Sequence, residues 1–259
     1  MRTAVIIPAR YGSTRFPGKP LAKVAGMMMI ERIWRIARQL KGVQGVYVAT
    51  DDARIADAVR GFGGEVIMTP ESCENGTERC FVAATKIKPT PEAVINFQGD
   101  AVLTPHWIVQ PLVDALNDGK NVQIVTPMVK LGAQQLDELI ALKKKSPASG
   151  TTVTFDRNMN ALYFSKTMIP HLRDGVENPP IYRHIGMYGY RMDTLEHYLK
   201  LPMGQFEKVE KLEQLRALEA GIPIRMVQVD YKGRTPASID SPEDLKYAEE
   251  LIAREGELF

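Results

Sequence analysis

The chain has 259 residues, a length that suits one large α/β domain or two small ones. Its hydrophobic and charged fractions, 44% and 25%, are those of globular proteins, and a net charge of +2 argues against nucleic-acid or membrane binding through bulk electrostatics. No apolar run approaches transmembrane length, and Cys73 and Cys80 lack metal-ligand spacing. We therefore expect a cytoplasmic protein with reduced thiols, and no nucleic-acid or membrane partner.

The first predicted strand leads into the most informative loop of the chain. Residues 3–7 are apolar and mostly β-branched, and residues 8–21 follow with glycines, prolines and the cations Arg10, Arg15 and Lys19. Prolines fix the course of such a loop, glycines let backbone N–H groups approach a ligand, and the cations attract negative charge. A solvated basic turn is the alternative, but cations spaced among Gly and Pro favour a polyphosphate site.

Strands and helices then alternate. The pattern predicts helices over 28–40, 53–62 and 76–87, and strands over 45–49, 65–68 and 93–97. This βαβαβ order indicates a parallel sheet with right-handed crossovers, which binds ligands beyond the carboxyl ends of its strands. The basic loop, Thr50, Asp51 and the Thr69 region lie at that edge, and Thr50 or Asp51 is expected to cap the second helix.

Two short motifs at the same edge suit a nucleotide and a metal ion. Gly76 and Thr77 at a helix start present free N–H groups to a base or ribose, although most such pairs are merely caps. Asp100, after Gln98 and Gly99, suits a Mg²⁺ ligand that faces the phosphate loop. The simpler interpretation of Asp100 is a helix N-cap.

Helices, strands and one loop are also expected over residues 105–191. We expect helices over 105–116 and 136–145, the latter ending in three solvated lysines, a strand over 122–129, and a hairpin of 151–155 with 161–164. A loop over 171–180 carries Arg173. A strand over 182–191 places His184, Gly186, Tyr188 and Tyr190 on one face, either to bind sugar hydroxyls or as half-buried packing.

The last elements are a helix, a strand and a further helix. The helix over 206–220 is expected to bury a stripe of apolar side chains, and the strand covers 224–229. Ser241 is expected to cap the final helix, which leaves Asp240 free to bind an ion. The buried stripe comprises Phe206, Val209, Leu212, Leu215 and Leu218.

Four blocks of the sequence resemble one family. Residues 8–21, 182–191, 212–216 and 238–245 are similar to motifs of the 3-deoxy-manno-octulosonate (Kdo) cytidylyltransferases, or CMP-Kdo synthetases, which make CMP-Kdo from CTP and Kdo for bacterial lipopolysaccharide or capsule. The resemblance implies an α/β fold with a Rossmann-like, mostly parallel sheet of the nucleotidyltransferase (GT-A-like) type. It further implies a single domain over 1–259, with a smaller antiparallel sugar-binding and dimerisation region at about 130–200, and a homodimer.

The same resemblance implies the site residues. Lys19, Arg10, Asp100 and Asp240 would be catalytic, and Asp100 with Asp240 would hold the cofactor Mg²⁺. The sugar acid would be bound by Arg173, His184, Tyr188, Glu213 and Gln214. CTP would be bound by Pro8, Ala9, Arg10, Ser13, Arg15, Lys19, Thr50, Asn75, Gly76, Thr77, Gln98 and Asp100.

Three positions depart from the family pattern. Asn75 replaces a serine, Ala101 follows Asp100 where a glutamate is usual, and Thr152 stands where many members have a lysine. Ala101 and Thr152 keep open the same chemistry on 8-amino-Kdo or another nonulosonic acid. A non-catalytic nucleotide- or sugar-binding protein is the other alternative, and the intact Arg10, Lys19, Asp100 and Asp240 argue against it.

Overall fold

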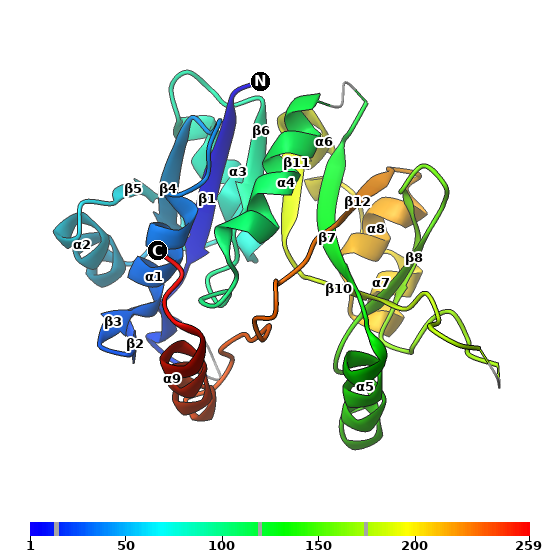
Figure 1. Ribbon diagram of the computed structural model, residues 1–259. Helices are drawn as coiled ribbons and strands as arrows, with labels where there is room; N and C mark the ends of the chain where they lie inside the picture. Colours follow the sequence, from blue (N-terminus) through cyan, green and yellow to red (C-terminus); the bar gives the residue numbers. More distant parts are fainter. Residues whose placement is uncertain (13–15, 119–120, 174–175) are drawn as a thin grey trace.

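The computed structural model describes residues 1–12, 16–118, 121–173 and 176–259, which build one large sheet covered by helices (Figure 1). The strands are β1 Thr3–Ala9, β2 Lys23–Val24, β3 Met27–Met28, β4 Gly45–Thr50, β5 Glu65–Met68, β6 Ala93–Asn96, β7 Ile124–Lys130, β8 Thr152–Phe155, β9 Ala161–Ser165, β10 Tyr182–His184, β11 Tyr188–Arg191 and β12 Ile224–Gln228. The helices are α1 Met29–Ala37, α2 Ala53–Gly61, α3 Gly76–Lys86, α4 His106–Asp118, α5 Ala133–Lys145, α6 Met192–Leu199, α7 Gln205–Glu210, α8 Gln214–Glu219 and α9 Glu243–Glu255, with the 3-10 helix η1 Lys19–Leu21.

The sheet combines a parallel and an antiparallel half. Its order is β5-β4-β1-β6-β11-β7-β10-β8-β9, and β12 pairs with β7 in parallel. Strands β5, β4, β1 and β6 are mutually parallel, whereas β11, β10, β8 and β9 pair antiparallel with their neighbours. The α/β fold with a mostly parallel nucleotide-binding unit is thus confirmed. The region at 130–200 adds its strands to this same sheet. That it is an inserted sugar-binding and dimerisation region stays a prediction.

The chain order creates a ligand-binding point beside β1. Strand β4 lies on one side of β1 and β6 on the other, so the direction of connection reverses between β1 and β6. Ligands of open α/β sheets bind at such a switch point, outside the carboxyl ends of the strands. Arg10 follows β1 and Gln98 to Asp100 follow β6, so the fold places both motifs there.

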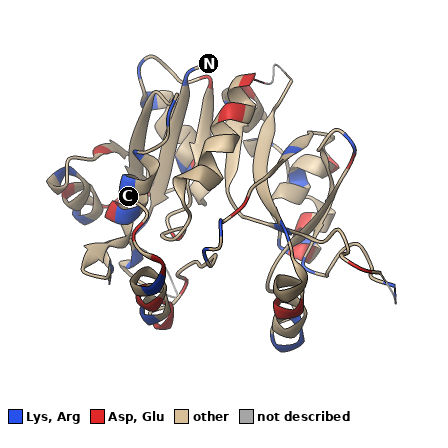
Figure 2. Cartoon of the chain, viewed as in Figure 1, with Lys and Arg blue, Asp and Glu red and all other residues tan. Residues whose placement is uncertain are grey.

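Alternation along β1 divides the core into two layers. Val5 and Ile7 belong to a buried cluster with α1, α4 and α9, whereas Ala4 and Ile6 belong to another with α3, α6 and α8. Because successive strand residues point to opposite faces, a strand covered on both sides needs apolar residues throughout. Charged side chains lie mainly on the helices and loops, and the central strands are nearly free of them (Figure 2).

The predicted helix over 206–220 is wrong as a single helix. Lys211 adopts a left-handed conformation, with φ of 54°, and separates α7 from α8. The two short helices fold together because Arg216 makes a two-pronged ion pair with Glu207, at 2.6 and 2.8 Å. As a consequence Phe206 and Val209 are 45% and 82% exposed instead of buried.

The predicted strand over 182–191 is also interrupted. Residues 185–187 leave the sheet between β10 and β11, and the Thr126 side chain lies within hydrogen-bonding distance of the carbonyls of Ile185 and Met187. His184 and Tyr188 nevertheless remain neighbours, with ring centroids 5.6 Å apart. The chain therefore keeps the predicted side-chain cluster but opens a turn within it.

Two predicted helix caps are wrong. The Asp52 carboxylate, rather than Thr50 or Asp51, accepts the N–H of Arg54 at the start of α2. At α9 the Ser241 hydroxyl is not the cap acceptor, because the Asp244 carboxylate accepts the N–H groups of Asp240 and Ser241. The N-cap of α2 is thus Asp52, whereas Asp244 lies in the first turn of α9, and both negative charges suit the positive end of a helix.

The lysines at the end of α5 are not all solvated surface. The Lys143 ammonium donates to the backbone carbonyls of Ser149, Gly150 and Lys166. Burial, and then the nearby Arg183 guanidinium, lower the pKa of Lys143. Lys143 thus ties α5 to the end of the β8–β9 hairpin. Within the described residues, no helix is both long and apolar enough to cross a membrane.

Candidate active site

Two aspartates from distant parts of the chain meet at one lysine. The Lys19 ammonium lies 3.7 Å from a carboxylate oxygen of Asp100 and 3.7 Å from one of Asp240. The Ile239 N–H also donates to the Asp100 carbonyl at 3.4 Å, which joins the segment before α9 to the end of β6. The predicted meeting of the basic loop with these two carboxylates is therefore present in the structure.

The two carboxylates repel each other unless a positive charge lies between them. Burial and then the Asp240 charge raise the pKa of Asp100, whereas Lys19 opposes the rise. Carboxylate oxygens are hard ligands, and Mg²⁺ is usually held by one or two of them together with substrate phosphates and water. The donor set therefore fits Mg²⁺. No group of three His, Cys, Asp or Glu suited to a metal occurs in the described ranges, so phosphate oxygens or waters would complete the coordination of such an ion.

The basic loop folds back on itself before it reaches Lys19. Gly18 has φ of +70°, and its N–H donates to the Tyr11 carbonyl at 2.9 Å. Since only glycine adopts this conformation without strain, the residue closes the loop and starts η1. Arg10 is exposed and forms no ion pair with any other described residue. Ser13 and Arg15, two further predicted nucleotide contacts, lie outside the described residues.

Three predicted nucleotide contacts pack together. A Cβ on Gly76 would lie 3.2 Å from the Pro8 ring and 3.8 Å from the Gln98 side chain, and one on Gly99 would lie 2.9 Å from the Pro8 carbonyl oxygen. Ala9, paired with Thr50, is buried at the adjoining end of β1. The end of β1, the start of α3 and the end of β6 therefore form one tight corner.

The other predicted nucleotide contacts have structural roles. Thr50 is fully buried, and its hydroxyl accepts the N–H of Asp52. The Asn75 side chain caps α3 by accepting the N–H of Glu78. Thr77 is buried, and its hydroxyl donates to Glu213 at 3.4 Å. These residues shape the corner, and Arg10 beside it is exposed.

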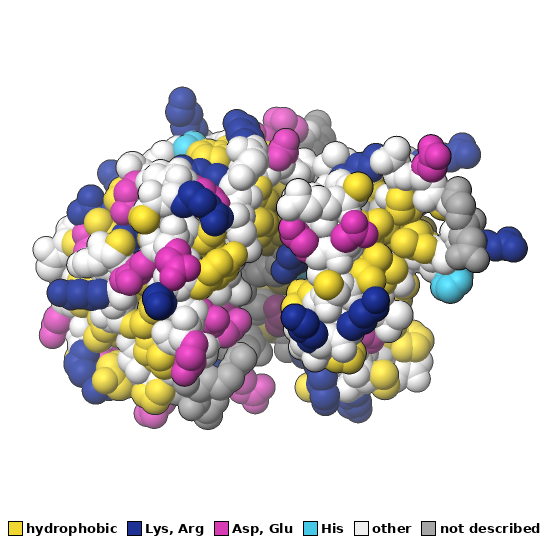
Figure 3. Space-filling model, turned by 60° about the horizontal axis from the view of Figure 1, so that its bottom comes forward, with side chains coloured by type: hydrophobic (Ala, Val, Ile, Leu, Met, Phe, Trp, Pro, Cys, Tyr) yellow, Lys and Arg dark blue, Asp and Glu magenta, His cyan; other side chains and the backbone are white. Residues whose placement is uncertain are grey.

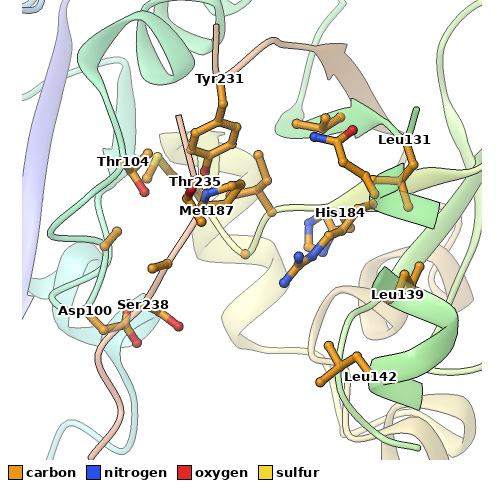
Figure 4. A pocket seen from close by; sticks show the side chains of 18 of the residues that line it. Asp100, Thr104, Leu131, Leu139, Leu142, His184, Met187, Tyr231, Thr235 and Ser238 are labelled. Carbon is orange, nitrogen blue, oxygen red and sulfur yellow. The ribbon is translucent and has the colours of Figure 1, made fainter. Parts of the chain in front are cut away.

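A cavity of about 550 Å³ opens beside Asp100. Asp100 and Ser238 line one side, Tyr231 and Thr104 its top, and His184 and Leu142 the opposite side (Figure 4). In the space-filling view a groove separates the part that carries α5 from the rest of the molecule (Figure 3). The described residues of the basic loop line neither this cavity nor the next one. Gln98 and Asp100 line the larger cavity, and Asp100 also lies beside Lys19 of the basic loop, so these two residues connect the loop to the cavity.

A second cavity, of about 250 Å³, gathers four of the five predicted sugar contacts. His184, Tyr188, Glu213 and Gln214 all line it, and His184 lines both cavities together with Gln98 and Gly186. The Gln214 side chain is 5% exposed, and its amide nitrogen has no hydrogen-bond partner among the described residues. A buried donor without a partner is costly, which makes this amide a candidate ligand contact.

Two aromatic rings, those of His184 and Tyr188, line the smaller cavity together with the charged Lys211 and Glu213. The rings of Phe164, His184, Tyr188, Tyr190 and Tyr198 follow one another, with centroids 4.9 to 6.2 Å apart. Burial lowers the pKa of His184 to about 3, so its imidazole is neutral at physiological pH. The rings pack on one another, as the packing interpretation expects, and those of His184 and Tyr188 also line the cavity. Sugar binding by this strand stays a prediction.

Glu213 is the carboxylic acid among the residues that line the smaller cavity. Burial raises the pKa of its carboxyl, while Arg216 and the Thr77 hydroxyl lower it. The residue sits at the start of α8, where the break after Lys211 lets the chain turn. The helix break at Lys211 thus precedes Glu213 and Gln214, which line the smaller cavity.

Arg173 is not brought to the site. It is exposed and lines neither cavity, and its segment extends away from the body of the molecule (Figure 1). Arg183 instead lines the larger cavity beside His184. Strict alternation in a continuous strand places Arg183 on the face opposite His184, which is why the sequence pattern did not select it. The strand ends at His184, and both side chains reach the cavity.

Comparison with known proteins agrees with this geometry. Residues 4–226 match the family model described as cytidylyltransferase. The 3-deoxy-manno-octulosonate cytidylyltransferase of Maricaulis maris is 52% identical over the full length of both chains. The 8-amino-3,8-dideoxy-manno-octulosonate cytidylyltransferase of Shewanella halifaxensis is 39% identical over 98% of this chain and 99% of its own.

A solved structure supports the same relationship. The structure of a CMP:2-keto-3-deoxy-manno-octonic acid synthetase complexed with CTP superposes with a TM-score of 0.87 at 36% identity, covering 98% of this chain and all of the other. Full-length identity at these levels and a shared fold do not arise from one motif. The chain therefore belongs to the cytidylyltransferases and, among them, to the family of the 3-deoxy-manno-octulosonate cytidylyltransferases.

Proposed function

We propose that this protein transfers CMP from CTP to the anomeric hydroxyl of a 3-deoxy-2-ulosonic acid, with Kdo as the substrate. The observation that carries the proposal is the position of Asp100. It meets Lys19 and Asp240 on one side, and on the other it lines the cavity that shares His184 and Gln98 with the smaller one. A charged subsite for a triphosphate thus adjoins a subsite for a sugar that His184, Glu213 and Gln214 line.

In the proposed reaction the anomeric oxygen bonds to the α-phosphorus of CTP. The bond between that phosphorus and the oxygen that bridges it to the β-phosphate breaks. Pyrophosphate leaves, and the hydroxyl proton passes to solvent. Lys19 and Arg10 would neutralise the phosphates, and His184, Glu213 and Gln214 would orient the sugar. No described side chain is placed as an obvious base, so positioning and charge neutralisation are expected to provide most of the rate.

Mg²⁺ is the proposed cofactor, with Asp100 and Asp240 as its protein ligands. When bound, a divalent ion neutralises developing phosphate charge and lowers the pKa of a coordinated hydroxyl. Lys19 now lies between the two carboxylates and would move toward the phosphates as the ion takes its place. Metal and CTP should therefore bind with positive coupling, and calorimetry of CTP with Mg²⁺ and with EDTA tests this. Equal CTP affinity in both would contradict the coupling.

The sugar is the least constrained part of the proposal. The 52% identical relative is named for Kdo, whereas the 39% identical relative is named for its 8-amino analogue. The higher identity to the relative named for Kdo is the observation that favours Kdo. Pyrophosphate release from CTP, measured with Kdo and with 8-amino-Kdo, decides between them. Faster turnover of the amino sugar would reverse the assignment, and no turnover with any ulosonic acid would favour a binding protein.

A homodimer in the cytoplasm completes the proposal. Three apolar side chains, which we call the apolar edge, lie exposed on or next to the last strand of the sheet: Leu162 of β9, and Phe206 and Val209 of α7. The Phe206 and Tyr163 rings are 6.0 Å apart, so α7 adjoins β9. Such exposed groups favour a protein partner, here a second copy. Free thiols at Cys73 and Cys80 suit a reducing compartment.

Light scattering tests the dimer. Val209→Asp should give a monomer, because a charge in an apolar interface is costly to bury. Met68→Asp, at the opposite end of the sheet on β5, is the matched control and should leave the dimer intact. A dimeric Val209→Asp variant, or a monomeric wild type, would contradict the proposed interface.

A further inference from the structure

Thr126 is a fully buried polar residue that contacts the candidate sugar site only through its neighbours. It lies on β7 and lines neither cavity. Its hydroxyl oxygen is 2.7 Å from His184 Nε2, 2.8 Å from the Met187 carbonyl oxygen and 3.3 Å from that of Ile185. One hydroxyl therefore holds both the imidazole and the turn that separates β10 from β11.

Counting protons assigns the direction of these hydrogen bonds. The hydroxyl has one proton, and a carbonyl oxygen can only accept. Two oxygens 2.8 Å apart require a proton between them, so Thr126 donates to Met187. The hydroxyl then has only lone pairs left for His184, and the close contact of 2.7 Å requires a proton on Nε2. His184 is the donor in this pair.

The assignment fixes the other face of the ring. A neutral imidazole carries one proton, so a proton on Nε2 leaves Nδ1 with a lone pair. Nδ1 makes no hydrogen bond to any other residue in the described ranges, and His184 lines both cavities. Phe164 and Tyr188, at centroid distances of 4.9 and 5.6 Å, prevent the ring from turning freely.

We propose that Thr126 is a positioning residue that holds His184 as the Nε2–H tautomer, so that Nδ1 accepts a hydrogen bond from a hydroxyl of the sugar substrate. The inference rests on the proposed function for the identity of the ligand, but not for the tautomer. It also gives the smaller cavity complementary polarity. Nδ1 is an acceptor, whereas the unpartnered Gln214 amide nitrogen is a donor. A hydroxyl can satisfy the first, and a sugar oxygen the second.

The tautomer is measured without any substrate. Nitrogen NMR of protein labelled at its four histidines distinguishes Nε2–H from Nδ1–H, and His184→Gln identifies the His184 signals by their loss. The wild type should show the Nε2–H form. Thr126→Val, which keeps the shape but removes the acceptor, should populate the Nδ1–H form. A wild-type His184 that carries its proton on Nδ1 overturns the proposal, whatever the activity.

Kinetics supply the functional half of the test. Thr126→Val should raise the KM for the sugar about three- to tenfold, the range of one neutral hydrogen bond, with the KM for CTP unchanged. Thr126→Ser retains the hydroxyl and should restore both the tautomer and the KM. Thr3→Val removes another fully buried strand hydroxyl, one that bonds Asn117 far from His184, and controls for lost packing.

The outcomes separate the two claims. An altered tautomer with an unchanged sugar KM would overturn the positioning role of Thr126. If Thr126→Val does not fold, the wild-type tautomer and the Thr126→Ser variant still test the role of Thr126. A Thr126→Ser variant that binds the sugar tenfold more weakly than the wild type contradicts the proposal. Wild-type protein in the Nε2–H form without turnover on any ulosonic acid would reject the proposed function and leave the tautomer assignment intact.

Discussion

The two halves of the candidate site are built in opposite ways. The phosphate half consists of charged side chains that balance one another, with Lys19 between Asp100 and Asp240 at 3.7 Å from each. The sugar half is built mainly from buried side chains, with the neutral His184 against aromatic rings, Thr126 behind it, and in the same cavity Glu213, whose carboxyl pKa is raised by burial. Charge can be neutralised by a ligand or an ion that arrives later, whereas buried polar groups must be oriented during folding.

This difference predicts how each half fails. Changes in the charged half should reduce turnover and alter metal dependence while the protein remains folded, because its groups are partly exposed and screened. Changes in the buried half should alter sugar binding and stability together. Substitutions in each half test this difference between the charged and the buried side chains.

The largest effect is expected from the metal carboxylates. Asp100→Asn and Asp240→Asn should each lower the rate of pyrophosphate release roughly 10²- to 10³-fold, because either loss dismantles the same site. The double variant should be little worse than each single one. Asp57→Asn, an exposed aspartate paired with Arg60, is the control. Full activity of the Asp240→Asn variant would reject the paired-carboxylate site.

Lys19 should show a smaller loss with a distinctive metal effect. Replacement by Met removes the proposed phosphate-binding cation and should cost about 2–4 kcal/mol of transition-state stabilisation, seen mainly in turnover. Without CTP the same change removes the cation that competes for the two carboxylates, so Mn²⁺ should bind the variant more tightly than the wild type. Weaker Mn²⁺ binding in titrations of the variant would contradict this picture.

The buried half is best tested by stability against pH. The pKa of His184 is lowered to about 3 in the folded protein, whereas an unfolded histidine titrates near 6.5. Between these values only the unfolded state binds the proton, so stability falls as the pH falls below 6.5. From pH 6.5 to 4.5 the wild type should lose roughly 2–3 kcal/mol more than His184→Gln in urea unfolding. Parallel curves for both proteins would show that His184 is not buried neutral.

The smallest effect is expected from an exposed contact in the charged half. The Arg54 guanidinium lies 3.3 Å from the Tyr11 ring centroid and also pairs with Asp52, all near the surface. Arg54→Ala should leave the urea midpoint within error, because solvent screens such pairs. A large drop would show that the loop after β1 depends on this contact, and would weaken the contrast between the halves.

The sequence alone determined the features that are local. The strand before the basic loop, the alternation of strands and helices up to β6, and the placement of Arg10 and Asp100 at one sheet edge follow from periodicity and chain order. The resemblance supplied the pairing of Asp100 with Asp240. Periodicity cannot find that pairing, since the two residues lie in distant segments.

Only the tertiary structure decided the sugar half. Apolar spacing at 206–220 fits one helix, but the Arg216–Glu207 ion pair and the left-handed Lys211 break it and bring Glu213 to the cavity. Alternation at 182–191 fits one strand, but the Thr126 hydroxyl, from a strand more than fifty residues earlier, holds a turn after His184. Local patterns report which faces are apolar. They carry no information about contacts between distant segments, and these contacts orient the buried groups.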